Sequence, residues 1–164
     1  MPEVVVSNST VIIALSSINY LYILKEVYKE IIISSEVFNE LSRGQDRPGS
    51  NIKEIDWINV CSISDERLKD YLSYHLHRGE AETIALAEEK KAFLVLLDDY
   101  WGRKIAELRK LRITGTMGII VKAKKEGIIK EVKPLLIELI YKGFWISDNL
   151  YNSILQKSDE GKET

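Results

Sequence analysis

The sequence predicts an α/β fold: a three-layer α/β/α sandwich with a central, mostly parallel sheet. Short β-branched or apolar runs alternate with segments whose apolar residues recur at helical spacing, which is the order of a parallel α/β protein. The run at 31–33 is wholly apolar, as in strands covered on both faces. The 164 residues suffice for one ordinary domain, and we expect it to span residues 1–156.

The composition is that of a globular protein. Hydrophobic residues make up 45% and charged residues 29% of the chain, which excludes disorder and fibrous repeats. The longest apolar runs, such as residues 93–97, are too short to span a bilayer. No basic region followed by a long apolar stretch opens the chain, so we expect a cytoplasmic location. The single cysteine, Cys61, cannot form an internal disulfide.

The first half of the chain reads as strand, turn and helix in repetition. Residues 4–6 form a β-branched strand, and a polar turn leads into a helix whose apolar residues recur at helical spacing. Further predicted elements are a helix over 20–30, the strand 31–33, a helix capped by Ser34 and Ser35, a loop over 43–51, the strand 58–61 and a helix over 65–77.

The second half repeats this alternation and then becomes helical. A helix over 79–91 precedes the strongest strand, 92–97, which ends abruptly at Asp98 and Asp99. We then expect a helix over 101–111, a strand over 112–114, a turn at Gly115 and helices over 116–126, 132–141 and 147–156. Residues 157–164 are polar and are expected to form a flexible tail.

Polar residues follow three of the predicted strands. In a parallel sheet the ligand site lies beyond the carboxyl ends of the strands. This rule brings together Asn8 and Ser9 after the first strand, Asp98 and Asp99 after the fourth, and residues 114–116 after the fifth. Adjacent carboxylates repel one another unless a cation or a basic partner lies between them, although a turn followed by a helix cap is the simpler explanation.

Other acidic residues have an ordinary structural explanation beside the functional one. Glu80 and Glu82 fall in the first turn of a helix, where the helix dipole favours negative charge. Glu40 shares a helix face with Glu36 and could simply be solvated.

Several kinds of site have little support. His75 and His77 lack partners at zinc-ligand spacing. The serine-hydrolase elbow and the glycine-rich phosphate and dinucleotide motifs are absent from the sequence. Carboxylate chemistry remains, and carboxylate oxygens select hard cations such as Mg²⁺ or Mn²⁺.

The charge is distributed unevenly along the chain. Residues 34–100 hold fourteen acidic and eight basic residues, a balance of −6, whereas residues 101–133 hold ten basic and three acidic residues, a balance of +7. An acidic centre beside a basic rim would suit a metal site that acts on a polyanion, and solvated helix faces give the same counts.

Five motifs in order resemble the PIN-domain family, closest to a prokaryotic subgroup near the VapC-type toxin ribonucleases. They are VVSNST at 5–10, VFNEL at 37–41, GEAETIALA at 79–87, LLDD at 96–99 and TGT at 114–116. The subgroup often ends in a segment like GFWIS at 143–147. The resemblance covers roughly residues 3–155 and implies the same α/β/α fold.

The resemblance also implies cleavage of RNA by a Mg²⁺- or Mn²⁺-dependent mechanism. Carried over by position, the family's acids fall on Glu40, Glu80 and Asp99 as catalytic residues, and the metal ligands on Asn8, Glu40, Glu80, Glu82, Asp98 and Asp99. The pocket hydroxyls correspond to Ser9 and Thr116. Arg103 matches a basic position of the family, and we expect it to bind RNA phosphates together with Arg109, Lys122 and Lys125 of the basic segment.

Asn8 departs from the family pattern, because most members have aspartate there. An amide still offers a carbonyl oxygen, but the site loses one negative charge and metal affinity should fall. A catalytically weak or inactive member that binds RNA or protein is therefore the main alternative to a ribonuclease. A small phosphatase-like hydrolase is the third, and it would need an aspartate nucleophile that Asn8 cannot replace. The family resemblance leaves open an antitoxin protein as partner and implies a homo-oligomer such as a dimer.

Overall fold

The computed structural model describes residues 3–44 and 46–161 and contains a parallel sheet at its centre. The five strands within these ranges are β1 (Val5–Ser7), β2 (Ile31–Ser34), β3 (Ile58–Cys61), β4 (Leu94–Leu96) and β5 (Ile113–Thr114). All neighbouring strands pair in parallel, in the order β3-β2-β1-β4-β5. The predicted parallel sheet is confirmed.

Helices connect and follow these strands. They are α1 (Ser9–Ser17), α2 (Tyr22–Tyr28), α3 (Ser35–Ser42), α4 (Glu66–Leu72), α5 (Arg78–Glu89), α6 (Tyr100–Leu108), α7 (Thr116–Lys125), α8 (Lys133–Tyr141) and α9 (Asp148–Lys157), with a short 3₁₀ helix at Ile52–Glu54. No helix among the described residues is long and apolar enough to cross a bilayer.

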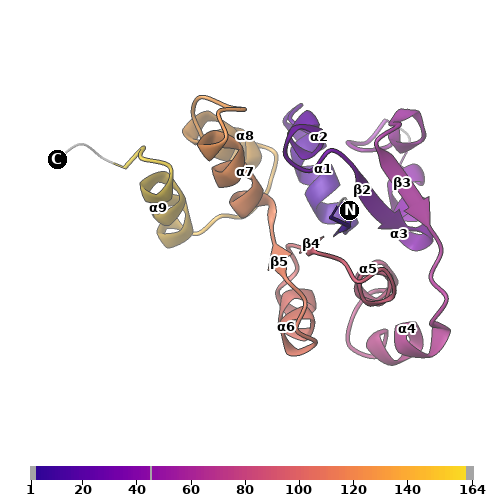
Figure 1. Ribbon diagram of the computed structural model, residues 1–164. Coiled ribbons are helices and arrows are strands. Elements are labelled where there is room, and N and C mark those ends of the chain that lie inside the picture. The colour runs from indigo at the N-terminus through magenta and orange to yellow at the C-terminus, as the bar shows by residue number, and fades with distance from the viewer. Residues whose placement is uncertain (1–2, 45, 162–164) are drawn as a thin grey trace.

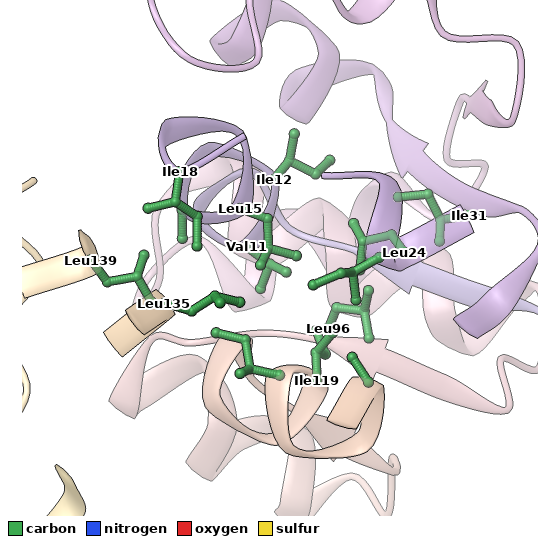
Figure 2. Packing of buried hydrophobic residues seen from close by; sticks show 14 of the residues in the cluster. Val11, Ile12, Leu15, Ile18, Leu24, Ile31, Leu96, Ile119, Leu135 and Leu139 are labelled. Atoms are coloured by element: carbon green, nitrogen blue, oxygen red, sulfur yellow. The ribbon is translucent and has the colours of Figure 1, made fainter. Parts of the chain in front are cut away.

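Alternating side chains of the strands divide the core into two parts. Val5 and Leu96 point to one face of the sheet, whereas Val6 and Val95 point to the other. The first face packs against α1, α2, α7 and α8, and Figure 2 shows side chains of α1 lying among those of α7, α8 and β4. The second face packs against α5 and α6, with α4 outside them (Figure 1). These two helical layers around one sheet confirm the α/β/α sandwich.

The predicted helices overshoot where lysines end them. Lys29, Lys91 and Lys110 have positive φ values of 72°, 51° and 62°, a left-handed conformation that terminates a helix. Glycine is the usual sequence signal for this conformation. Because lysine occupies these positions, the predicted helices extend beyond their observed ends. The helix predicted over 65–77 is also shorter, because α4 ends at Leu72 and α5 starts anew after His77.

The segment predicted as a flexible tail starts with residues attached to the core. The Glu160 carboxylate accepts backbone hydrogen bonds from Val132 (2.7 Å) and Lys133 (3.1 Å) and pairs with Lys124 at 2.9 Å. Burial opposes the charged form, but these donors outweigh it and lower the pKa of Glu160. Residues 158–160 therefore join the ends of α7, α8 and α9, and residues 162–164 lie outside the described residues.

Candidate metal centre

The strand order creates a crevice between β1 and β4. The chain passes from β1 to β2 on one side and returns to β4 on the other side of β1. Connections therefore leave the carboxyl ends of β1 and β4 in opposite directions, and ligands bind in such crevices. Asn8 follows β1, and Asp98 and Asp99 follow β4, so the topology brings these residues to one edge.

Asn8 lies at the carboxyl end of β1, beside the end of β4. Its backbone N–H donates to the Leu96 carbonyl at 2.9 Å and so joins the ends of β1 and β4. The residue is only 1% exposed, and within the described part of the chain its Oδ1 atom has no hydrogen-bond partner. A buried oxygen without a donor is costly, and it is available to a cation or an ordered water.

Ser9 positions the first carboxylate. Its Oγ donates a hydrogen bond to Oε2 of Glu40 at 2.8 Å, which links the start of α1 to α3. The Glu40 carboxylate lies against the buried Gly79, where a Cβ would overlap it. Gly79 thus leaves room for the Glu40 carboxylate at the start of α5, one residue before Glu80.

Glu80 is the second carboxylate. Its Oε2 accepts the backbone N–H of His77 at 2.9 Å, as in a capping box at the start of α5. Burial and the charge of Asp99 raise its pKa; His77 acts in the opposite direction, and Glu40 adds to the increase. The raised pKa therefore reflects burial first, and after it the negative charges of Asp99 and Glu40 nearby.

Asp99 is the third carboxylate and also the N-cap of α6. Its Oδ2 accepts the Gly102 N–H at 2.7 Å, which fixes the side chain beside the crevice and uses one of its two oxygens. We call Glu40, Glu80 and Asp99 the acidic cluster. No lysine, arginine or histidine of the described residues lies within 4.0 Å of these three carboxylates as an ion pair.

The three carboxylates of the acidic cluster are not arranged as a preformed metal-binding site. With the side chains as they stand, no three Asp, Glu, His or Cys residues in the described ranges form a group that could hold a metal ion. A metal site would require the side chains of Glu40 and Glu80 to move, and both are long side chains, on α3 and α5. Asn8 offers an amide oxygen in addition to these acids.

Two other predicted ligands point elsewhere. Both oxygens of Asp98 are engaged by Thr116, from its N–H at 2.8 Å and its Oγ at 2.6 Å, so Asp98 caps the start of α7. The carboxylate of Glu82 accepts the Glu36 N–H at 2.9 Å and caps α3. Residues two apart on a helix are about 200° apart around its axis. Glu80 and Glu82 therefore cannot both face the acidic cluster, and their spacing already indicates this.

The hydroxyls predicted for the pocket are likewise separated. Ser9 bonds to the acidic cluster through Glu40, whereas the Thr116 hydroxyl donates to Asp98. Two contacts of the site were not predicted from the sequence. They are the packing of the Glu40 carboxylate against Gly79 and the hydrogen bond from the His77 N–H to Glu80. A glycine before two acids at a helix start was the available signal for the first of these.

Among the basic residues predicted to bind RNA, Arg103 lies nearest to the crevice. Its guanidinium lies beside Gly115, next to the Asp98 carboxylate. Arg109 is committed to Glu88 by two hydrogen bonds, from Nε and Nη2, each of 2.9 Å. This bidentate pair fastens α6 to α5 and uses the donors that a phosphate would need.

Lys122 and Lys125 lie at the other edge of the sheet. The helix α7 starts at Thr116 beside the crevice and runs away from it, so these lysines are roughly 9 to 14 Å further along its axis. Burial and the charge of Glu126 raise the pKa of Tyr28 to about 12, which places the end of α7 near the start of β2. Lys122 also forms an ion pair with Glu126 at 3.6 Å. Of the four basic residues predicted to bind RNA, Arg109, Lys122 and Lys125 are therefore not gathered around the acidic cluster.

The fold and this site define a class: a parallel α/β domain with carboxylates at the switch point of its sheet. A family model described as a PIN domain matches residues 4–160. The chain therefore belongs to the PIN-domain family, and its fold is of the nuclease type. PIN domains generally depend on divalent metal ions. A comparison with curated proteins found no match.

Proposed function

We propose that this protein is a metal-dependent ribonuclease that hydrolyses RNA phosphodiester bonds at the acidic cluster. The observation that carries the proposal is the meeting of Glu40, Glu80 and Asp99 at the carboxyl edge of the sheet, where burial and neighbouring charge raise the pKa of Glu80. Acids that repel one another in the absence of a cation are suited to bind one.

The donor set suits Mg²⁺ or Mn²⁺. Both cations prefer oxygen ligands, and the crevice offers three carboxylates and the orphaned Oδ1 of Asn8. Glu40, Glu80 and Asp99 would hold the cation, with Asn8 as a neutral fourth donor. A bound cation supplies an activated water and neutralises charge on the phosphate.

The protein's own residues position these donors. Ser9 holds the Glu40 carboxylate through its hydroxyl, and the N-cap bond to Gly102 fixes Asp99. Arg103 is a half-buried residue of α6 whose guanidinium lies beside Gly115 at the start of α7, where it could hold a phosphate oxygen at the other side of the crevice. Asp98 and Glu82 take part as positioning residues, since each caps a helix that borders the crevice.

We include in the proposal a toxin–antitoxin role in the cytoplasm, with an antitoxin or a second copy as protein partner. Support comes from exposed apolar side chains on α8 and after it, among them Ile137, Ile140, Tyr141 and Trp145. Apolar surface of this kind marks protein interaction sites.

A non-catalytic RNA-binding or protein-binding module is the second candidate. Asn8 favours it, because the amide lowers the charge of the site by one relative to most of the family. The absence of a ready three-ligand group among the described residues favours it too.

Cleavage of a mixed RNA pool separates the two functions. We expect the full chain to cleave the pool with Mn²⁺ or Mg²⁺ and to stop in EDTA. The Glu40→Gln variant should lose most of this activity, whereas Glu36→Gln, which changes a carboxylate one turn away on the same helix, should keep it. RNA binding without cleavage in any of the metals would establish the binding module instead.

A further inference from the structure

A largely apolar groove runs between α4 and α6, with α5 between these two helices (Figure 1). Its volume is about 510 Å³, within the usual range for small-molecule sites. The lining comes from the end of α4 and one side of α6: Tyr71, Leu72, His75, Trp101, Ile105, Leu108 and Arg109. Trp101 is 65% exposed and Tyr71 is 61% exposed, so aromatic faces are open to a ligand.

Both walls of the groove start at the acidic cluster. Asp99 caps α6, and Trp101 follows it in the first turn of that helix. On the other wall, the chain runs from His75 to His77, whose backbone N–H is bound by Glu80. The end of the groove at Trp101 is therefore two residues along the chain from Asp99 of the acidic cluster.

The charges around the groove favour stacking over phosphate contacts. Arg109, the one arginine in the lining, is held by Glu88, and the exposed lysines of α7 lie at the far edge of the sheet. The net charge of the chain is −2, so long-range attraction of a polyanion is weak. Beyond the phosphate contact proposed for Arg103, affinity for a nucleic acid along this groove would come from its bases, whose faces stack on aromatic rings.

We propose that the groove between α4 and α6 binds a nucleobase of single-stranded RNA, with Trp101 as the stacking residue. The site rests on the proposed ribonuclease function and adds to it the requirement for an unpaired base beside the cleaved phosphate. A base inside a duplex cannot reach the groove, because it is already stacked and paired. Tyr100, the other aromatic residue in the first turn of α6, extends this aromatic surface. Its ring centroid lies 5.2 Å from that of Trp101, and the Nζ of Lys104 lies 5.5 Å from the centroid of the Tyr100 ring.

Binding of fluorescein-labelled oligoadenylate, measured by fluorescence anisotropy in EDTA, tests the groove without cleavage. Trp101→Ala should weaken binding roughly 5- to 150-fold, since one base stacked on an aromatic ring contributes about 1–3 kcal/mol. Tyr22→Ala is the control, because Tyr22 is an aromatic residue that is 47% exposed and lies at the start of α2, outside the groove. Both variants should keep the parent melting temperature, and the duplex with oligouridylate should bind more weakly than the single strand.

Equal affinities of the Trp101→Ala and Tyr22→Ala variants would overturn the inference, and so would equal binding of duplex and single strand. A fall in mass of Trp101→Ala in sedimentation, with RNA binding unchanged, would assign the groove to contact between two copies instead. Failure of the proposed function has a different signature. A parent that binds the single strand through Trp101 but leaves it intact in Mn²⁺ keeps the groove and loses the ribonuclease.

Discussion

Asn8 stands where the resemblance to PIN domains leads us to expect an aspartate, and the fold encloses it. The residue is buried, its N–H is bound to Leu96, and its Oδ1 has no partner among the described residues. Asn and Asp have nearly the same shape and differ in one side-chain group, an amide NH₂ in place of a carboxylate oxygen. If missing charge limits the site, replacing that group should change its metal affinity.

The Asn8→Asp variant should therefore bind Mn²⁺ more tightly and cleave RNA faster than the parent. A carboxylate adds Coulombic attraction that a neutral amide cannot supply. In EDTA the variant should be less stable by at least about 1 kcal/mol, because a buried charge is added beside other carboxylates. Mn²⁺ at ten times its Kd should return about 1.4 kcal/mol. Thermal melts with and without metal check this, and unchanged melting in both would show that Asn8 does not face the acidic cluster.

Glu80 predicts a pH dependence. Its pKa is raised above the ordinary 4.5, so the folded chain holds the proton more tightly than the unfolded chain does. The contribution of Glu80 to the free energy of unfolding is thus greatest below pH 4.5 and falls as the pH rises through the raised pKa. Glu80→Gln keeps an oxygen for the His77 N–H and has no such fall.

In EDTA, Glu80→Gln should consequently equal or exceed the parent in stability at pH 7, by up to about 1 kcal/mol. The difference should shrink toward pH 4, where the parent carboxyl is protonated in both states. Urea unfolding at a series of pH values measures it. Glu82→Gln is the control, since Glu82 lies outside the cluster. If Glu80→Gln instead became less stable than the parent as the pH rises, the direction of the Glu80 pKa shift would be wrong.

At the scale of elements, the sequence contained most of the fold. The five strands were predicted near their observed places, because apolar and β-branched runs bounded by polar turns have few alternatives. Helix ends were predicted less well, since lysines with positive φ end α2, α5 and α6 without a glycine. The direction of side chains at the helix starts was the feature that the sequence predicted least well. Asp98 and Asp99 are adjacent, yet Asp98 caps α7 and Asp99 caps α6.

The Arg109–Glu88 pair predicts coupling between α6 and α5. Arg109→Ala should lower the free energy of unfolding by about 1 kcal/mol, because it removes a bidentate, half-buried ion pair. A double-mutant cycle with Glu88→Ala isolates the pair, and a coupling energy near zero would show that solvent replaces it fully. Lys122→Ala, which breaks an exposed pair at the end of α7, should change stability much less.

At the scale of the whole molecule, the separation of acidic and basic segments along the chain does not produce separate acidic and basic regions in the fold. The acidic segment 34–100 and the basic segment 101–133 suggested an acidic centre with a basic rim. The fold pairs Arg109 with Glu88 and Lys124 with Glu160, and α7 carries Lys122 and Lys125 to the far edge. Counting charges could not show this, because pairing depends on which helices become neighbours.

Two independent arguments, each supplying different residues, predicted the candidate site. Strand ends in a parallel sheet predicted Asn8 and Asp99, and the resemblance to PIN domains added Glu40 and Glu80. No local pattern tells that α3 and α5 approach closely at Gly79, which is what brings Glu40 to the crevice.

Calorimetric titration with Mn²⁺ tests most directly whether the acidic cluster is the metal site. The parent is compared with Asp99→Asn and Asp98→Asn, which remove one charge each from adjacent positions. Either asparagine can keep a helix-capping oxygen, so both variants should fold. We expect Asp98→Asn to bind Mn²⁺ nearly as the parent does and Asp99→Asn to bind at least about tenfold more weakly. Binding by Asp99→Asn as tight as by the parent, or a loss confined to Asp98→Asn, would contradict the assignment of the site.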